Sequence, residues 1–344
     1  MSSAGLHEID EETTPEASRV PPRARSRAKS VKSVAHVFAT PILLLVFLAL
    51  FSILAPSTFA TWENLSTIIS SQAVIGCLAL AAIVPLAIGE FDLSFGYAVG
   101  FVGLAGAALG NDGLSPVLVI ALMLAIGAAV GIINGVLVVY LNISSFIATL
   151  GVGFVLSGLS DGISGGESLF AGIPHIVISI GQSKILSVVL AAWITGALAL
   201  CLYYFLQHTP PGRYLFAIGG SKRVARLAGV NTNRYRLLAF VIAGLITAVA
   251  GILALGENGS ASPSFGPDLL LPAYAAVFLG VTSFRPGRYN VAGTVCALLV
   301  LGVGVSGVEL LGAPLWIQPV FTGCALLLAV VVARQEARRV QVGG

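Results

Sequence analysis

Apolar runs of about 20 residues recur along the chain from Val37 onward, and they limit its fold more than any other feature. In a bilayer, a run of this length can cross the hydrocarbon as one helix that satisfies its own backbone hydrogen bonds. Only 10% of the 344 residues are charged and the mean hydropathy is +0.97, whereas a soluble domain carries about 25% charged residues. The sequence therefore predicts an all-α, polytopic membrane protein.

The apolar runs divide into ten predicted spans. Asn64 is expected to cap the second helix, and Asp92 or Ser94 the glycine-rich third. The eighth span is short and lies between Pro267 and Pro286, which is typical of a discontinuous helix. The predicted spans cover residues 37–55, 65–89, a part of 89–110, 114–140, 146–160, 184–206, 237–255, 269–284, 290–310 and 315–333.

The distribution of Lys and Arg supports ten spans with both termini in the cytoplasm. In this topology Lys184 is the one residue among the 18 Lys and Arg that lies at an outer end, as the preference for cytoplasmic positive charge requires. Residues 36–333 then form the transmembrane domain. Residues 1–35 are expected to be a disordered cytoplasmic tail, and 334–344 a cytoplasmic C-terminal tail.

Five spans on each side of a long outer loop, residues 161–183, suggest an internal duplication. An odd number of spans per half would make the two five-helix halves inverted relative to each other. The segments GEFDLSFG (89–96) and GVTSFRPG (280–287) share a glycine frame and a Ser-Phe pair. They are the matching segments that the sequence suggests.

The longest polar stretch inside the chain is the loop 207–236, which carries six Lys and Arg residues. Ser221 is expected to cap a short helix that Gly229 ends, and Asn231 to cap the helix of the seventh span. Val224 and Leu227 would share one face of that short helix, together with the neighbouring alanine. The positive charge alone would orient the chain in the membrane, but a capped amphipathic helix also suits a groove on a cytoplasmic partner.

The sequence lacks the common motifs for nucleotide binding, for zinc-dependent hydrolysis and for a catalytic serine. The chain has no G-x-x-x-x-G-K-[ST] phosphate loop, no H-E-x-x-H and no G-x-S-x-G. Its four cysteines lie singly in apolar runs and its histidines do not cluster, so no catalytic, cofactor or metal site is predicted. Asp92, with Glu90 beside it, is the best acidic candidate for binding a coupling ion, although Asp92 also reads as a helix cap.

Several stretches, in order along the chain, resemble one known family. GRYLFAIGGSKRVARLAGVNTNRYRLLAFVIAGLITAVAGIL (212–253) closely resembles the permease subunits of ribose-type sugar ABC importers. EFDLSFG (90–96), NGVLVVYLNISSFIATLGVGFVLSGL (134–159) and AYAAVFLGVTSFRPGRYNVAGTVCALLVLGV (273–303) are similar to further segments of that family. The resemblance covers roughly residues 37–333.

This resemblance implies a transport subunit rather than an enzyme, in the cytoplasmic (inner) membrane of a bacterium. Its partners would be cytoplasmic ATP-binding subunits, an extracytoplasmic sugar-binding protein, and a second permease chain that is either an identical copy or a paralogue. No nucleic acid would be involved. The residues expected to couple to the ATPase are Gly220, Ser221, Lys222, Ala225, Arg226, Leu227, Gly229 and Val230, and those expected on the translocation path are Asp92, Ser94, Asn134, Phe146 and Thr149.

Some positions depart from the family pattern. Glu90 stands where glycine is usual, Ser144 and Ser145 replace a proline-containing pair, and Arg285-Pro286 replaces a glycine turn. A pentose or related small polyol is the favoured substrate, and the branched-chain amino acid permeases are more distant relatives. Two other hypotheses remain: an ion-coupled secondary transporter that uses Asp92 or Glu90, and an intramembrane enzyme, which the missing motifs disfavour.

Overall fold

A computed structural model describes residues 38–342, and the predicted tail 1–35 lies outside them. The described chain is helical apart from one hairpin, β1 (Lys184–Ile185) with β2 (Val188–Val189), and one isolated bridge. The helices are α2 (Ala39–Leu54), α3 (Trp62–Ser71), α4 (Ala73–Ala87), α5 (Phe95–Asn111), α6 (Pro116–Val139), α7 (Ser145–Ser164), α8 (His175–Gln182), α9 (Leu190–His208), α10 (Pro210–Gly220), α11 (Lys222–Leu227), α12 (Thr232–Asn258), α13 (Pro267–Gly280), α14 (Val291–Leu310) and α15 (Ile317–Val342).

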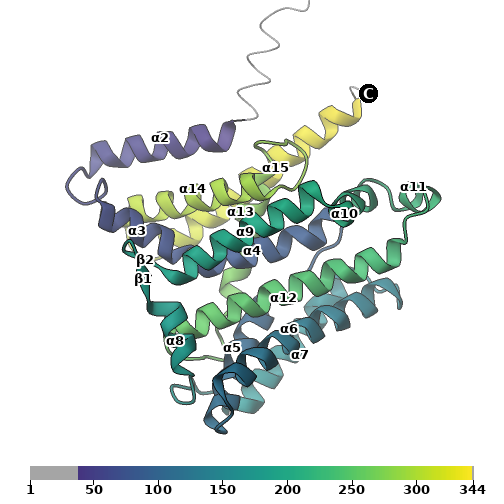
Figure 1. Cartoon of the computed structure of the whole chain (residues 1–344). Helices are drawn as coiled ribbons and strands as arrows, with labels where there is room; N and C mark the ends of the chain where they lie inside the picture. Colours follow the sequence, from purple (N-terminus) through teal and green to yellow (C-terminus); the bar gives the residue numbers. More distant parts are fainter. Residues whose placement is uncertain (1–37, 343–344) are drawn as a thin grey trace, which may run out of the picture.

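The long helices lie side by side, with α12 at the centre of the bundle (Figure 1). α12 packs against α4 on one side and against α5 and α6 on the other. The short helices α10 and α11 lie at one end of the bundle, and α8 with the β1–β2 hairpin lies at the opposite end (Figure 1). From the distribution of positive charge we expect the end with α10 and α11 to be the cytoplasmic one.

The fold class predicted from the sequence is confirmed, and every predicted span has a helical counterpart. Five helices are long and apolar enough to cross a membrane: α6, α7, α9, α12 and α14. The pair α3–α4, bent by 43°, makes a sixth if the two helices are counted as one span, and α2, α5, α13 and residues Ile317–Val331 of α15 are shorter apolar helices. The 14 residues of α13 rise only about 21 Å, less than the ~30 Å of hydrocarbon, in agreement with the short span expected there.

Four local details differ from the sequence expectations. Thr61, not Asn64, caps the helix of the second span, because Thr61 is extended and its hydroxyl accepts from the Asn64 backbone N–H at 3.2 Å. The sixth span begins later than expected, because residues Leu186 and Ser187 form a tight turn with positive φ and residues 184–189 become a hairpin. The polar loop holds a second helix, α10, and α15 continues through residues expected as the C-terminal tail.

Close helix packing depends on glycine where α6 crosses α12. A Cβ at Gly127 would lie 2.4 Å from the Gly244 carbonyl oxygen, and one at Gly131 would lie 2.4 Å from that of Phe240. These backbones therefore touch, as small residues allow in membrane bundles. The four-residue glycine spacing in the sequence places both contacts on one face of α6.

The packing of the first half is repeated in the second half. α5 packs against α6 and α7, and α13 packs in the same way against α14 and α15. The sequence repeat is AIGE…SFG (87–96) and ALGE…SFG (254–266), each preceding one of these central helices. The match suggested from GVTSFRPG was wrong in register, since 280–287 follows α13 whereas 89–96 precedes α5.

The two SFG segments touch each other near the middle of the bundle. A Cβ at Gly266 would lie 2.1 Å from the Gly96 carbonyl oxygen, and one at Gly100 would lie 2.0 Å from that of Phe265. Gly266 has φ of 116°, which side-chain-bearing residues rarely adopt. The repeated motif thus places glycine where the two halves meet.

Candidate functional site

The polar loop 207–236, called the coupling loop after its predicted role, folds into two short helices that each begin at a side-chain cap. Thr209 caps α10 by accepting from the Gly212 N–H at 3.3 Å, with Pro210 at the first helical position. Ser221 caps α11 by accepting from the Val224 N–H at 3.3 Å. Gly229 follows α11 with φ of 81°, as a helix-ending glycine does. The predicted cap–helix–glycine order is confirmed.

α11 shows its apolar side to solvent and not to the bundle. Leu227 is 80% exposed and Val224 63% exposed, whereas Ala225 is only 4% exposed and faces the rest of the protein. The Val230 N–H donates to the Ala225 carbonyl at 3.0 Å, and Asn231 then caps α12 by accepting from the Arg234 N–H. The helix is therefore fixed on its inner side by Ala225 and free on the side of Leu227.

Charged residues of this loop have different surroundings. Arg226 donates to the Thr232 hydroxyl at 3.4 Å, which ties α11 to the start of α12. Partial burial lowers the pKa of Lys222, and the positive charge of Arg236 lowers it further. Lys222 and Arg226 thus lie beside the first turn of α12, while Gly220 and Ser221 are exposed at the junction of α10 and α11.

The chain is unwound between α4 and α5, and side chains from two other helices, α7 and α13, satisfy its backbone there. Gly89, with φ of 80°, ends the helical path of the second span. The Phe91 N–H donates to the Ser145 hydroxyl at 3.2 Å and the Leu93 N–H to the Thr149 hydroxyl at 2.9 Å. The Tyr274 hydroxyl from α13 accepts from the Asp92 N–H at 3.2 Å and donates to the Asp92 carbonyl at 2.6 Å.

The carboxylate of Asp92 is part of the same network. One of its oxygens accepts from the Ser94 backbone N–H at 2.9 Å and from the Ser94 hydroxyl at 2.6 Å. Asn134 on α6 donates its amide to the Ser94 hydroxyl at 2.7 Å. The Asn134 oxygen is buried and has no hydrogen-bond partner within residues 38–342. Asp92 therefore orders the first turn of α5, where Ser94 occupies the N-cap position.

An ion pair joins this unwound segment to the helix that follows the coupling loop. Arg236 on the first turns of α12 donates to the carboxylate of Glu90. The side chain of Arg236 is 5% exposed and that of Glu90 is 20% exposed. The second terminal nitrogen of Arg236 is buried and unpartnered within the described part of the chain. The sequence marked Glu90 as a departure from the family pattern, but it gave no sign that Arg236 would pair with it.

Four of the five residues predicted on the translocation path come together here. Asp92, Ser94, Asn134 and Thr149 are all buried, with exposed fractions of 3% or less. Phe146 instead lies on the outer side of α7 and is 52% exposed. Tyr274 was not foreseen, because a tyrosine in an apolar run gives no sign of the distant backbone that it will contact.

A hollow of about 670 Å³ adjoins the unwound segment on the side of α10. Gly89 and Phe91 line it on one side, and Arg213, Arg288 and Tyr289 on the other. The guanidinium of Arg288 stacks 3.8 Å from the ring of Phe216. The segment that carries Glu90 and Asp92 thus reaches a polar opening on the side of the coupling loop.

Comparison with known proteins identifies the family. A family model described as a branched-chain amino acid transport system permease component matches residues 64–330. The chain belongs to this permease family. No solved structure gives a significant match. The matched residues include the unwound segment, the polar network and the whole coupling loop.

Curated relatives of this chain are permease proteins named for ribose, L-arabinose and autoinducer 2. It is 33% identical to the ribose import permease protein RbsC of Escherichia coli (strain K12) over 298 residues, which cover 86% of this chain and 92% of that protein. It is 30% identical to the L-arabinose ABC transporter permease protein AraH of Azospirillum brasilense over 320 residues, 92% of both chains. The autoinducer 2 import system permease protein LsrD of Photorhabdus laumondii is 30% identical over 300 residues. The resemblance to ribose-type sugar ABC permeases is confirmed.

Proposed function

We propose that this permease forms the translocation path of an ABC importer for a small sugar, a pentose or a related polyol, and works as a pair of permease chains. An extracytoplasmic binding protein would deliver the sugar to the outer face, and cytoplasmic subunits would hydrolyse ATP. Relatives named for ribose and L-arabinose support the substrate class. Their coverage of most of the chain supports the same overall role.

The observation that carries the ATPase partnership is the free apolar face of α11. Leu227 and Val224 are largely exposed at the end of the molecule that lies in the cytoplasm. A helix of six residues does not hold its shape in water alone, but here caps, Ala225 and Val230 hold it. An apolar helix face held rigidly away from the membrane is suited to a groove on another protein.

The coupling route suggested by the contacts runs from α11 to the membrane interior. Arg226 ties α11 to the start of α12, and Arg236 on α12 pairs with Glu90 in the unwound segment. Movement of α11 on ATP binding would therefore be transmitted to the segment that carries Asp92. Phe91 lies on the cytoplasmic hollow, so that opening is the proposed exit of the path.

The test is a pair of substitutions at Leu227 in the complete transporter. Leu227→Asp should abolish co-purification of the ATP-binding subunit, whereas Leu227→Met, which keeps an apolar side chain of similar volume, should preserve it. Both variants should insert in the membrane equally, because Leu227 is exposed. Unchanged co-purification of the Asp variant would exclude α11 as the docking element.

The alternative is an ion-coupled secondary transporter that uses Asp92 or Glu90. In the structure both carboxylates already have partners, Ser94 for Asp92 and Arg236 for Glu90, which favours structural roles over ion binding. The energy source for uptake by the reconstituted complex distinguishes the ABC importer from the secondary transporter. Uptake that stops without ATP supports the importer, and uptake that persists without ATP but collapses with an ionophore supports the secondary transporter.

A further inference from the structure

A large apolar groove lies within the membrane-spanning part of the protein, between α4, α9 and α14. Its volume is about 840 Å³. Side chains of Leu80, Ala199, Leu200 and Leu298 line it, and Gly196 leaves open space at its edge. It lies beside the bundle and apart from the unwound segment and from the coupling helix, so the proposed function does not use it.

The groove follows much of the length of α9. Along this helix its lining runs from Ala192, near the β1–β2 hairpin, to Tyr203, which is a rise of about 17 Å at 1.5 Å per residue. Leu200 on its edge is 72% exposed. A Cβ added at Gly196 would meet no described atom within 4 Å. In a bilayer, an apolar space open along a helix face will be filled by hydrocarbon.

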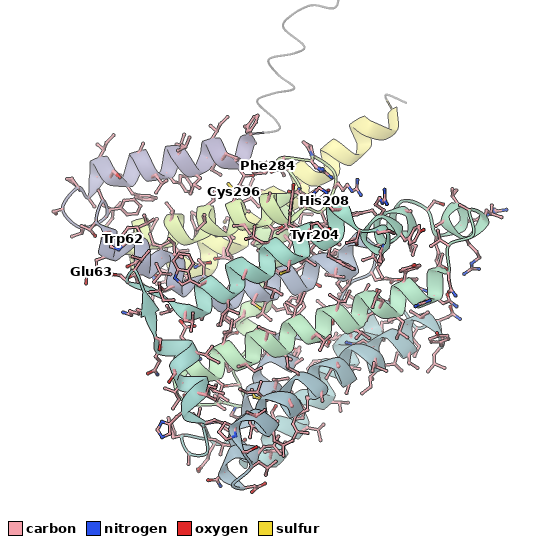
Figure 2. All side chains as sticks on the ribbon, in the orientation of Figure 1. Trp62, Glu63, Tyr204, His208, Phe284 and Cys296 are labelled. Carbon is pink, nitrogen blue, oxygen red and sulfur yellow. The ribbon has the colours of Figure 1, made fainter. Side chains whose placement is uncertain are left out.

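The cytoplasmic end of the groove carries aromatic and cationic groups. Phe284 closes it there, and the next residue, Arg285, donates to the side chain of Gln207 near the end of α9. Tyr204 and His208 stack with ring centroids 5.5 Å apart. Figure 2 shows Phe284, Cys296, Tyr204 and His208 gathered near this end, with Trp62 and Glu63 at the far, outer end.

We propose that this groove is a binding site for an anionic phospholipid of the cytoplasmic leaflet. One acyl chain lies along Gly196 and Leu200, and the head-group phosphate faces Arg285. The apolar lining matches the chain, and the positive charge lies at the end where anionic head groups are concentrated. Basic pockets between membrane helices on the cytoplasmic side are suited to such head groups.

Filling the groove tests the acyl-chain part of the site. Gly196→Phe places a ring in the open space without a clash, and Ala197→Phe is the matched control, because Ala197 is an exposed neighbour on α9 that does not line the groove. The complete transporter is delipidated, then incubated with vesicles of phosphatidylglycerol in phosphatidylcholine, and its retained lipids are counted by native mass spectrometry. We expect Gly196→Phe to lose the tightly held phosphatidylglycerol and Ala197→Phe to keep it.

Removing the charge tests the head-group part. Arg285→Gln should lower the preference for phosphatidylglycerol over phosphatidylcholine about fivefold, which corresponds to ~1 kcal/mol for one cation near the membrane surface. Arg234→Gln, an exposed cytoplasmic arginine on α12, should leave the preference unchanged. Equal retention by Gly196→Phe and the wild type would overturn the site. If the two permease chains dissociate in Gly196→Phe while lipid retention is unchanged, the lipid site is also excluded, because the groove would then be a contact with the second chain.

Discussion

Removing the carboxylate of Glu90 should destabilise the protein by stranding Arg236. The side chain of Arg236 is 5% exposed, and one of its terminal nitrogens has no partner within residues 38–342. Without Glu90 the other nitrogen also loses its acceptor. Truncating one member of a buried ion pair costs about 3–5 kcal/mol. The 20% exposure of Glu90 lets some water reach Arg236, so we expect ~3 kcal/mol, the lower end of that range.

The measurement is the thermal unfolding of Glu90→Ala in detergent, followed by the loss of monodisperse protein. A cost of ~3 kcal/mol corresponds to a decrease of about 4 °C in the apparent melting temperature for a chain of this size. Glu167→Ala is the matched control, because Glu167 is an exposed glutamate of an outer loop. Glu167→Ala should change the free energy of unfolding by no more than about 0.5 kcal/mol.

The double variant Glu90→Leu with Arg236→Met distinguishes the ion pair from other causes. If the cost comes from an unpaired guanidinium, removing both charges should restore most of the stability, since an apolar pair of similar size avoids the desolvation of either charge. A double variant as unstable as the sum of the two single variants would refute the reasoning. It would show that Glu90 and Arg236 act independently.

Three further substitutions test other parts of the structure. Gly131→Leu should destabilise the fold by about 1–3 kcal/mol or more and lower the yield of folded protein in size-exclusion profiles, because its Cβ would lie 2.4 Å from a carbonyl oxygen of α12. Gly151→Leu, with open space around its Cβ, should be tolerated. Tyr274→Phe should cost about 1–3 kcal/mol in thermal unfolding, since it strands both backbone groups of Asp92, and Tyr97→Phe should have little effect. Ser221→Ala should raise hydrogen exchange within α11 about fivefold, the effect of losing a cap worth ~1 kcal/mol, with the exchange of α12 unchanged; equal exchange in α11 would exclude the cap.

Local signals in the sequence were sufficient for most of the elements. The apolar runs located the spans, because burying a helix in hydrocarbon requires about 20 apolar residues in succession. Ser221, Gly229 and Asn231 marked the helix boundaries of the coupling loop, since capping depends on residues three or four apart. The prediction failed where two nearby residues could both act as the N-cap: Thr61, three residues before Asn64, caps α3.

Contacts between distant segments were beyond these signals. Arg236 pairs with a residue 146 positions earlier, and Tyr274 bonds to a residue 182 positions earlier. Neither sequence neighbourhood contains its partner, so only the packing of α12 and α13 against the unwound segment brings them together. The groove beside α9 likewise exists because three helices from different parts of the chain leave a space between them.

By itself, the sequence determined that this chain is a multi-span helical membrane protein with a capped helix in its polar loop, because hydropathy and capping act over a few turns of one helix. The tertiary structure decided what those helices do together. It turned Asp92, Ser94, Asn134 and Thr149 into one buried network that holds an unwound segment, and it left Leu227 exposed while burying Ala225. The unwound backbone has N–H groups without partners in its own helix, and only the packing of the helices brings side chains from distant segments to them. The same packing decides which side of α11 is buried.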